Sequence, residues 1–342
     1  MTPFQDPPHA PQHPPLLLSA ALCLQGAAIA QPAPATGSAT VPHISAARQV
    51  PYAAQAMVLA SALAGSRLVA VGDHGMVLLS DDGGRTHRQA RSVPVDVTLT
   101  SVAFADALNG WAAGHAGVIL HTADGGETWS LQRKDLQEDR PLFALHFFDA
   151  AHGVAVGLWS LVLATDDGGA TWRKVDLAPP EGARKADLNL LGLFADARGR
   201  LFAAAEKGTV LRSDDQGRTW TYLPTGYQGS FWTGAATPDG TLLAAGLRGS
   251  LYRSGDDGRT WQRVETHSQS SITALQARGS TVVGAGLDGL VLRSADSGAS
   301  FATEVRPDRL ALTSVVAGAG TPDRPDVFYS RQGPVAPPAT AR

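Results

Sequence analysis

The segment Asn109–Trp129 reads NGWAAGHAGVILHTADGGETW and contains two motifs in a fixed order. The first is Gly-Trp-x-x-Gly-x-x-Gly. The second is Ser/Thr-x-Asp-x-Gly-x-Thr-aromatic, which we call the Asp-box. A short apolar run of strand character joins the two motifs, and both carry the glycines that tight turns use. The segment therefore predicts β-strands connected by a Gly-x-x-Gly hairpin and an Asp-box hairpin.

The Asp-box recurs six times along the chain. Successive box aspartates are 42, 43, 48, 41 and 40 residues apart. Each box follows a short apolar run, and a further strand with its own turn lies upstream. Four short antiparallel strands in about 41 residues make one blade of a β-propeller. The six boxes are Ser80–His87, Thr122–Trp129, Thr165–Trp172, Ser213–Trp220, Ser254–Trp261 and Ser294–Phe301.

A seventh unit follows the sixth box but has no box of its own. Leu312–Ala317 and Asp326–Ser330 look like its first two strands. Ala47–Pro51 resembles the strand that follows other boxes, so we expect this N-terminal strand to complete the last blade and close the ring. The sequence predicts an all-β, seven-bladed propeller of four-stranded antiparallel blades over residues 44–335, with six contiguous blades and one composite blade.

The two ends of the chain differ from the repeats. Leu16–Ala30 is an apolar run of signal-peptide length that ends in a small-x-small pattern, although Met1–Pro15 lacks the usual basic residues. We expect a signal peptide over 1–30, a flexible linker over 31–43, a disordered tail over 336–342, and export to the periplasm, or to the lumen in a photosynthetic host. The alternative is a disordered Pro-rich leader ahead of a short buried segment.

Composition excludes several classes of function. The net charge is −3 without a long basic run, which argues against nucleic-acid binding. The only cysteine, Cys23, cannot form an internal disulfide or a thiolate metal site alone, and modification by a lipid is a further possibility for it. The sequence contains no nucleophile elbow and no phosphate-binding loop. We therefore expect no catalytic residue, no cofactor and no metal.

The box residues are predicted to be structural. The aspartate can accept backbone N–H groups across the turn, the glycine permits a positive φ, and the aromatic ring packs beside the hairpin. A calcium site is the alternative, but no downstream glutamate closes the loop as such sites require. The structural set is Asp82, Asp124, Asp167, Asp215, Asp256, Asp296, Trp129, Trp172, Trp220 and Trp261.

Partner binding is predicted on the face opposite the boxes. If the boxes join strands three and four, the Gly-x-x-Gly hairpins and the inter-blade loops lie together on the other face. The candidate partner-binding residues are His74, His115, Trp159, Lys207, Arg248 and Arg331. The loops should add Arg133, Lys134, Arg140, Arg184, Lys185, Arg306 and Arg309. Together they suggest a protein-docking rim; the alternative is a set of ordinary hydrated turn residues.

The segment Asn109–Trp129 resembles the repeat of the photosystem II assembly and stability factors of cyanobacteria and chloroplasts. The Gly-Trp lead-in at Trp111 is the more diagnostic half of the repeat. The resemblance implies an exported or lumenal, non-catalytic propeller that holds a newly made membrane protein for assembly. We expect a monomer with a membrane-protein client of unknown identity.

An enzyme of the Asp-box class is the second hypothesis. Sialidases and certain glucan-cleaving hydrolases also carry Asp-boxes, and they need paired carboxylates or a tyrosine with a glutamate. The nearest candidates are Tyr222 and Tyr227 in one inter-blade loop and Glu265 one blade later. The sequence shows no Arg-Ile-Pro signature near the first blade.

Overall fold

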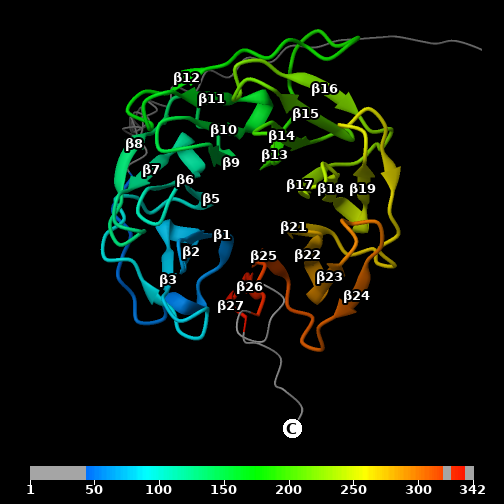
Figure 1. The fold of residues 1–342 in the computed structure, drawn as a ribbon. Helices are drawn as coiled ribbons and strands as arrows, with labels where there is room; N and C mark the ends of the chain where they lie inside the picture. The colour runs from blue at the N-terminus through cyan, green and yellow to red at the C-terminus, as the bar shows by residue number, and fades with distance from the viewer. Residues whose placement is uncertain (1–43, 319–324, 336–342) are drawn as a thin grey trace, which may run out of the picture. The chain divides into compact units, whose positions relative to one another are not determined.

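The computed structural model describes residues 44–318 and 325–335. The predicted signal peptide, linker and C-terminal tail lie outside the described residues. The described chain forms seven antiparallel sheets around a central axis (Figure 1), which confirms the seven-bladed propeller. No helix in these residues is long and apolar enough to cross a membrane.

Six blades have four strands each, in sequence order from the axis outward. The strands of the first three blades are β1 (Val58–Ala64), β2 (Arg67–Gly72), β3 (Val77–Ser80) and β4 (Arg88–Gln89); β5 (Leu99–Phe104), β6 (Gly110–Gly114), β7 (Ile119–Thr122) and β8 (Ser130–Arg133); β9 (Leu142–Phe147), β10 (Gly153–Gly157), β11 (Val162–Thr165) and β12 (Arg173–Lys174). The strands of the next three are β13 (Leu190–Ala195), β14 (Leu201–Ala205), β15 (Thr209–Ser213) and β16 (Thr221–Pro224); β17 (Phe231–Ala236), β18 (Leu242–Gly246), β19 (Leu251–Ser254) and β20 (Gln262–Arg263); β21 (Ile272–Arg278), β22 (Thr281–Gly286), β23 (Leu290–Ser294) and β24 (Ala302–Val305).

The core lies between the blades. The second strand of a blade is covered on both faces by neighbouring blades, so β6, β10, β14 and β18 are buried along their whole length. These strands are apolar throughout and do not alternate, as expected for strands buried on both faces. The outermost strands are only two to four residues long and largely exposed.

The seventh blade has three strands, β25 (Leu312–Val316), β26 (Val327–Ser330) and β27 (Gly333–Pro334). The structure does not show the predicted closing strand, because residues 44–52 form no strand and instead contact blade 1. There the amide of Ala47 donates to the carbonyl of Val93 at 3.0 Å. β27 is a poor template for a fourth strand because Pro334 has no N–H group.

The ring closes through its innermost strands. β25 lies beside β1 in Figure 1, and two side-chain hydrogen bonds join them. The Thr313 hydroxyl donates to the carbonyl of Val58 at 2.6 Å, and the Ser61 and Ser314 hydroxyls are 2.7 Å apart. The N-terminal segment adds a short 3₁₀ helix, η1 (Ala53–Gln55), which contacts β27. Closure therefore depends on inner-strand contacts and a loop.

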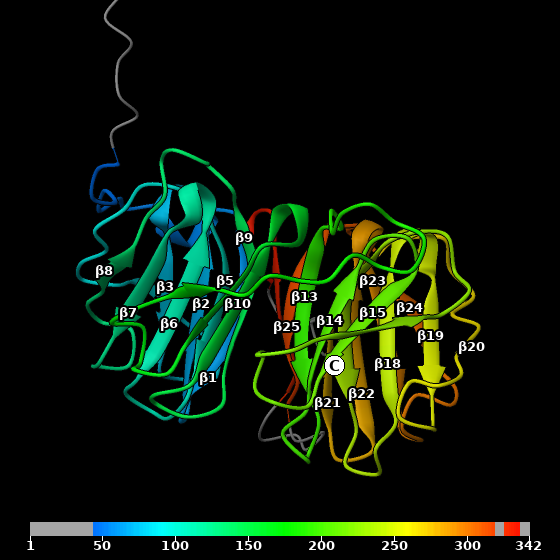
Figure 2. The same cartoon turned by 90° about the horizontal axis from the view of Figure 1, so that it is seen from above.

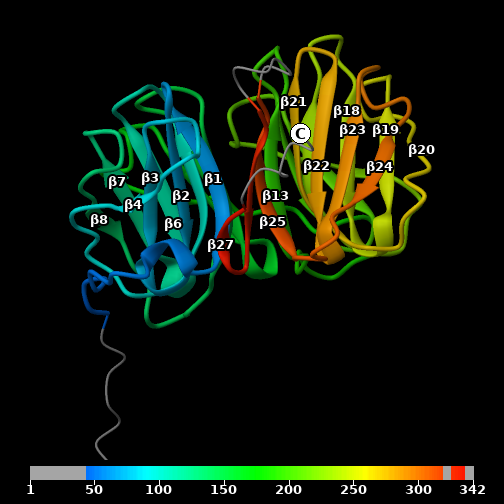
Figure 3. The same ribbon diagram turned by 90° about the horizontal axis from the view of Figure 1, so that it is seen from below.

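The strand order places the two kinds of turn on opposite faces. In each four-stranded blade the Asp-box joins the third and fourth strands, and the Gly-x-x-Gly turn joins the second and third; Ser160 replaces the second glycine in blade 3, and Ala205 replaces the first in blade 4. Figures 2 and 3 show the strands running between these two faces, with turns gathered at both ends. We call them the Asp-box face and the Gly-x-x-Gly face; the inter-blade loops lie on the latter.

Candidate partner-binding face

Each Asp-box is a closed set of hydrogen bonds. In the fourth box, Asp215 Oδ1 accepts from the Ser213 hydroxyl and the Thr219 amide, both at 2.8 Å, and Oδ2 accepts from the Thr219 hydroxyl at 2.6 Å. The amide of Gly217 donates to the Ser213 hydroxyl at 2.7 Å. The other five boxes repeat these four bonds, including the sixth, where Ser300 replaces the usual threonine.

The bonded carboxylates are held in the charged form. Hydrogen bonds from the side chain and amide of Thr171 lower the pKa of Asp167 to about 2, and those from Thr260 do the same for Asp256. In Asp124 and Asp215 burial alone would raise the pKa, but the hydrogen bonds outweigh it and the net shift is downward. A carboxylate that already accepts three hydrogen bonds has most of its acceptor sites used, which leaves little capacity for a ligand.

The aromatic position of the box packs against its own turn or against the neighbouring blade. The indole N–H groups of Trp129, Trp220 and Trp261 donate to the glycine carbonyl of their own box at 2.9 to 3.1 Å. His87 replaces tryptophan in the first box, and its Nε2 lies 3.1 Å from the Tyr329 hydroxyl of blade 7. Tyr329 is fully buried, so His87 has a structural role at the closing junction.

The diagnostic tryptophan of the lead-in is also structural. Trp111 is buried and stacks on Phe147, with ring centroids 3.5 Å apart. Its indole N–H donates to the carbonyl of Gly168 at 3.0 Å, and Gly168 belongs to the Asp-box of the next blade. Trp111 therefore ties one blade to the turn of its neighbour and presents no surface to a partner.

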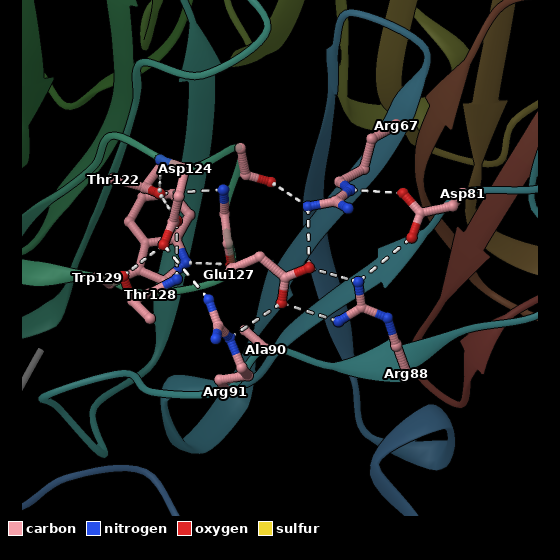
Figure 4. Close-up of polar contacts among 12 residues, drawn as sticks. Arg67, Asp81, Arg88, Ala90, Arg91, Thr122, Asp124, Glu127, Thr128 and Trp129 are labelled. Atoms are coloured by element: carbon pink, nitrogen blue, oxygen red, sulfur yellow. Dashed lines mark hydrogen bonds and ion pairs between the residues drawn. The ribbon is translucent and has the colours of Figure 1, made fainter.

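An ion-pair cluster connects blades 1 and 2 on the Asp-box side (Figure 4). Glu127 of the second box accepts from Arg88 at 3.0 Å and lies 3.2 Å from Arg67 and 3.6 Å from Arg91. Asp81 pairs with both Arg67 and Arg88. The hydrogen bond from Arg88 is the main cause of the lowered pKa of Glu127. These arginines are paired with acids of the chain itself, so we interpret the cluster as a junction between blades.

The Gly-x-x-Gly turns are shaped by close backbone approach. A Cβ atom on Gly72 would lie 1.8 Å from the carbonyl oxygen of Met57, and one on Gly75 would lie 1.9 Å from that of Val95. Five of the six complete turns form a single turn of 3₁₀ helix: η2 (Asp73–Gly75), η3 (His115–Gly117), η4 (Leu158–Ser160), η5 (Leu247–Gly249) and η6 (Leu287–Gly289). Where both glycines are present, they let the turn lie against the inner strand and the inter-blade loop. The residues between them differ from blade to blade.

The structure places all six candidate residues on this face, and all six are exposed. His74, Trp159, Lys207 and Arg248 occupy the third turn position with φ between 52° and 55°, the left-handed region. In blade 2 that position belongs to Ala116, which is buried, and His115 is exposed at the second position. Arg331 holds the second position in blade 7. No contact in the structure tests whether these residues bind a partner.

The loop cations fall into two groups. Three of these arginines are largely buried and bonded within the chain. Arg133 donates to the carbonyl of Gly117, Arg140 pairs with Glu138, and Arg306 pairs with Asp308. Lys185 lies 3.9 Å from Asp187. Among the described residues, Lys134, Arg184 and Arg309 are exposed and form no ion pair. The predicted rim of loop charge is therefore smaller than the sequence suggested.

The residues considered for hydrolysis are each bonded to other groups of the chain. The Tyr222 hydroxyl donates to the carbonyl of Ala178 at 2.9 Å, and the Tyr227 hydroxyl to that of Leu247 at 3.2 Å. Glu265 lies 3.8 Å from Arg263 instead. Within the part of the chain that the structure describes, no cluster of histidine, cysteine and acidic side chains could hold a metal ion.

Sequence reasoning did not identify Asn189 and Glu206, which support the turn of Trp159. The Asn189 side-chain oxygen accepts from the Trp159 amide at 3.0 Å, and Glu206 accepts from the amide and side chain of Asn189, each at 3.0 Å. No motif marks these residues. The one available signal was the 48-residue spacing between Asp167 and Asp215, which indicates a longer loop between blades 3 and 4.

Six Asp-boxes on a closed ring of seven blades define an Asp-box propeller. The model of one propeller family, described as photosynthesis system II assembly factor YCF48, matches residues 88–282, which is more than half of the chain. The chain belongs to this family, as its resemblance at Asn109–Trp129 predicted. No curated protein matches the chain in sequence.

Several solved structures share the fold at low sequence identity. A structure titled YCF48 bound to D1 peptide is 19% identical, with a TM-score of 0.66, and the match covers 85% of this chain and 94% of that one. YCF48 from Cyanidioschyzon merolae is 15% identical with a TM-score of 0.63, covering 84% and 96%. The computationally designed Ika8 protein is 16% identical with a TM-score of 0.56, covering 82% and 95%. At these identities the structures support the fold alone.

Proposed function

We propose that the protein is a non-catalytic scaffold that binds a segment of a membrane-protein client through its Gly-x-x-Gly face. The observation that carries this proposal is the contrast between the faces. Each box carboxylate accepts at least three hydrogen bonds within its own turn, whereas His74, His115, Trp159, Lys207, Arg248 and Arg331 are displayed on the other face. Family membership and a relative whose structure is titled as bound to D1 peptide support peptide binding.

The client and its compartment are part of the same proposal. We propose that the chain is exported, because Leu16–Ala30 has the length and small-x-small ending of a signal peptide. The client is then a protein of the envelope, or of the thylakoid in a photosynthetic host. Aromatic and arginine side chains such as Trp159 and Arg248 are the types that dominate binding energy in protein interfaces.

Crosslinking in the native envelope tests the proposal. We expect the wild-type protein to capture the same membrane protein reproducibly. Combined replacement of Arg248 and Arg331 by alanine should reduce this capture several-fold without changing the melting temperature, because both side chains are exposed and form no ion pair in the described structure.

Arg278→Ala is the matched control. Arg278 is exposed at the end of β21, on the Asp-box face, and also forms no ion pair in the described residues. Its replacement should leave capture intact. Equal loss of capture in both variants, or no reproducible membrane protein with the wild type, would contradict the proposal.

A further inference from the structure

Trp159 is the one exposed tryptophan among the seven, all of which lie in the described residues, and it stands on the Gly-x-x-Gly face. Its relative exposure is 59%, on a turn that projects from blade 3. Its backbone lies at φ 52° and ψ 53°, and the next residue, Ser160, also has a positive φ of 56°. Bulky side chains rarely adopt this region, because their Cβ atom then lies too close to the following carbonyl oxygen. Two such residues in succession make this the most strained of the six turns.

Hydrogen bonds to the segment that enters blade 4 hold the backbone of Trp159 and Ser160 in this conformation. The Asn189 side-chain oxygen accepts from the Trp159 amide at 3.0 Å, and Glu206 accepts from the backbone amide and the side-chain NH2 group of Asn189. The Ser160 amide donates to the carbonyl of Leu188 at 2.7 Å. Four of the other five complete turns have glycine after a non-glycine left-handed residue that is exposed. In blade 3 the exposed residue in the left-handed region is Trp159, although a glycine at this position would remove its strain.

Cations lie beside this turn. Lys207 follows Glu206 directly and occupies the equivalent position on blade 4, where it is exposed. The ammonium groups of Lys207 and Lys185 each lie 3.9 Å from the single carboxylate of Asp187, the outer limit of an ion pair. Both ammonium groups are therefore only loosely paired and keep donors for an acidic group, while the carboxylate of Glu206 is engaged by Asn189.

We propose that Trp159 and Lys207 form a two-point site for an extended peptide that carries an apolar side chain followed by a carboxylate. The apolar side chain packs on the indole of Trp159, and the carboxylate binds the ammonium group of Lys207. Asn189 and Glu206 are positioning residues that hold the two together across blades 3 and 4. This inference rests on the proposed function, and it names the site and the peptide chemistry.

The test uses the full propeller and one defined probe, the peptide Gly-Ser-Gly-Leu-Phe-Asp-Asp-Gly-Ser-Gly. The indole N–H resonance of Trp159 is identified by its absence in Trp159→Phe. We expect this resonance to move saturably with a Kd on the order of 1 mM, as for a short peptide with two anchors. Replacing Leu-Phe by Ser-Ser in the probe should abolish the shift. Replacing Asp-Asp by Asn-Asn, or Lys207→Ala in the protein, should weaken binding at least about threefold.

Trp159→Gly separates binding from folding. Glycine relieves the left-handed strain, so we expect an unchanged or higher melting temperature, by up to about 2 °C, together with complete loss of probe binding. Asp288→Gly is the matched control, because Asp288 occupies the same turn position in blade 6 with φ 56°. It should keep probe affinity unchanged. Asn189→Ala should lower probe affinity while Trp159 itself is still present.

Three results would overturn the inference. The first is a Trp159 resonance that the probe leaves unmoved. The second is a Trp159→Gly variant that binds the probe like the wild type. The third is a shift produced by a cello-oligosaccharide but not by the peptide, which would favour a carbohydrate site. Client capture that survives Trp159→Gly but is lost on replacement of Arg248 and Arg331 would refute this site alone and leave the proposed function standing.

Discussion

The two hairpins of a blade are stabilised in different ways. The Asp-box is held by side chains, because Asp215 accepts three hydrogen bonds within its own turn and Ser213 accepts a fourth. The Gly-x-x-Gly turn is held by backbone contacts, because its glycines let carbonyl oxygens of neighbouring segments approach. The first arrangement uses up the polar groups of the box. The second leaves side chains such as Trp159 and Arg248 exposed at the third turn position.

This difference explains which turn varies among the blades. The box keeps its aspartate and its hydroxyl residues six times, since each makes a specific hydrogen bond. The third position of the other turn holds histidine, alanine, tryptophan, lysine, arginine or aspartate, since close backbone contacts shape the turn itself. The variable face is therefore the one on which binding specificity can develop without loss of the fold.

Gly208→Ala should give the largest effect on stability. Gly208 has a φ of 61°, and a Cβ atom there would lie 1.9 Å from the carbonyl oxygen of Tyr227, so the inter-blade loop would have to move. We expect a loss of about 3 kcal/mol or more in the free energy of unfolding, measured with urea. The neighbouring Lys207→Ala should change it by no more than about 0.5 kcal/mol. Similar losses of stability in the two variants would contradict the view that the glycine position shapes the turn and the middle position does not.

Asp215→Ala should give the next largest effect. The substitution leaves the Thr219 amide and two hydroxyl groups without their acceptor, and we expect a loss of about 1–2 kcal/mol, as when a helix loses its N-cap. Asp214 is the matched control because it makes only an exposed ion pair with Arg212 at 3.1 Å. Asp214→Ala should cost about 0.5 kcal/mol or less. A comparable loss at Asp214 would show that charge, and not the box geometry, stabilises the turn.

The smallest effect on stability should appear only at acidic pH. The pKa of Asp167 is lowered from 3.8 to about 2 by hydrogen bonds from Thr171, so the folded state favours the charged form. Its contribution to stability is complete above about pH 4 and is lost as the pH falls toward about 2. The melting temperature of the wild type should therefore fall in that range, and Asp167→Asn should fall less steeply. Parallel curves for the two proteins would contradict this assignment.

The ring and its turns could be predicted from the sequence because each blade repeats the same local interactions. Residues that bond within one turn, such as Ser213 with Asp215, are close in the chain and leave a pattern. Contacts between segments that are far apart in the chain leave no such pattern in the sequence. Residue spacing therefore does not predict that His87 of the first box bonds to Tyr329, 242 positions away. The sequence likewise suggested that Arg133 and Arg140 were free, whereas the structure pairs them within the loop of blade 2.

By itself, the sequence determined the number of blades, the positions of the Asp-boxes and the face on which variable side chains are displayed. These features follow from a 40- to 48-residue repeat whose turns are stabilised locally. Only the tertiary structure decided how the ring closes and which surface residues are held in place. The N-terminal segment contacts Val93 of blade 1 and adds no strand to blade 7, and Asn189 holds Trp159 from a neighbouring blade. Both depend on packing between segments far apart in the chain, which residue spacing does not encode.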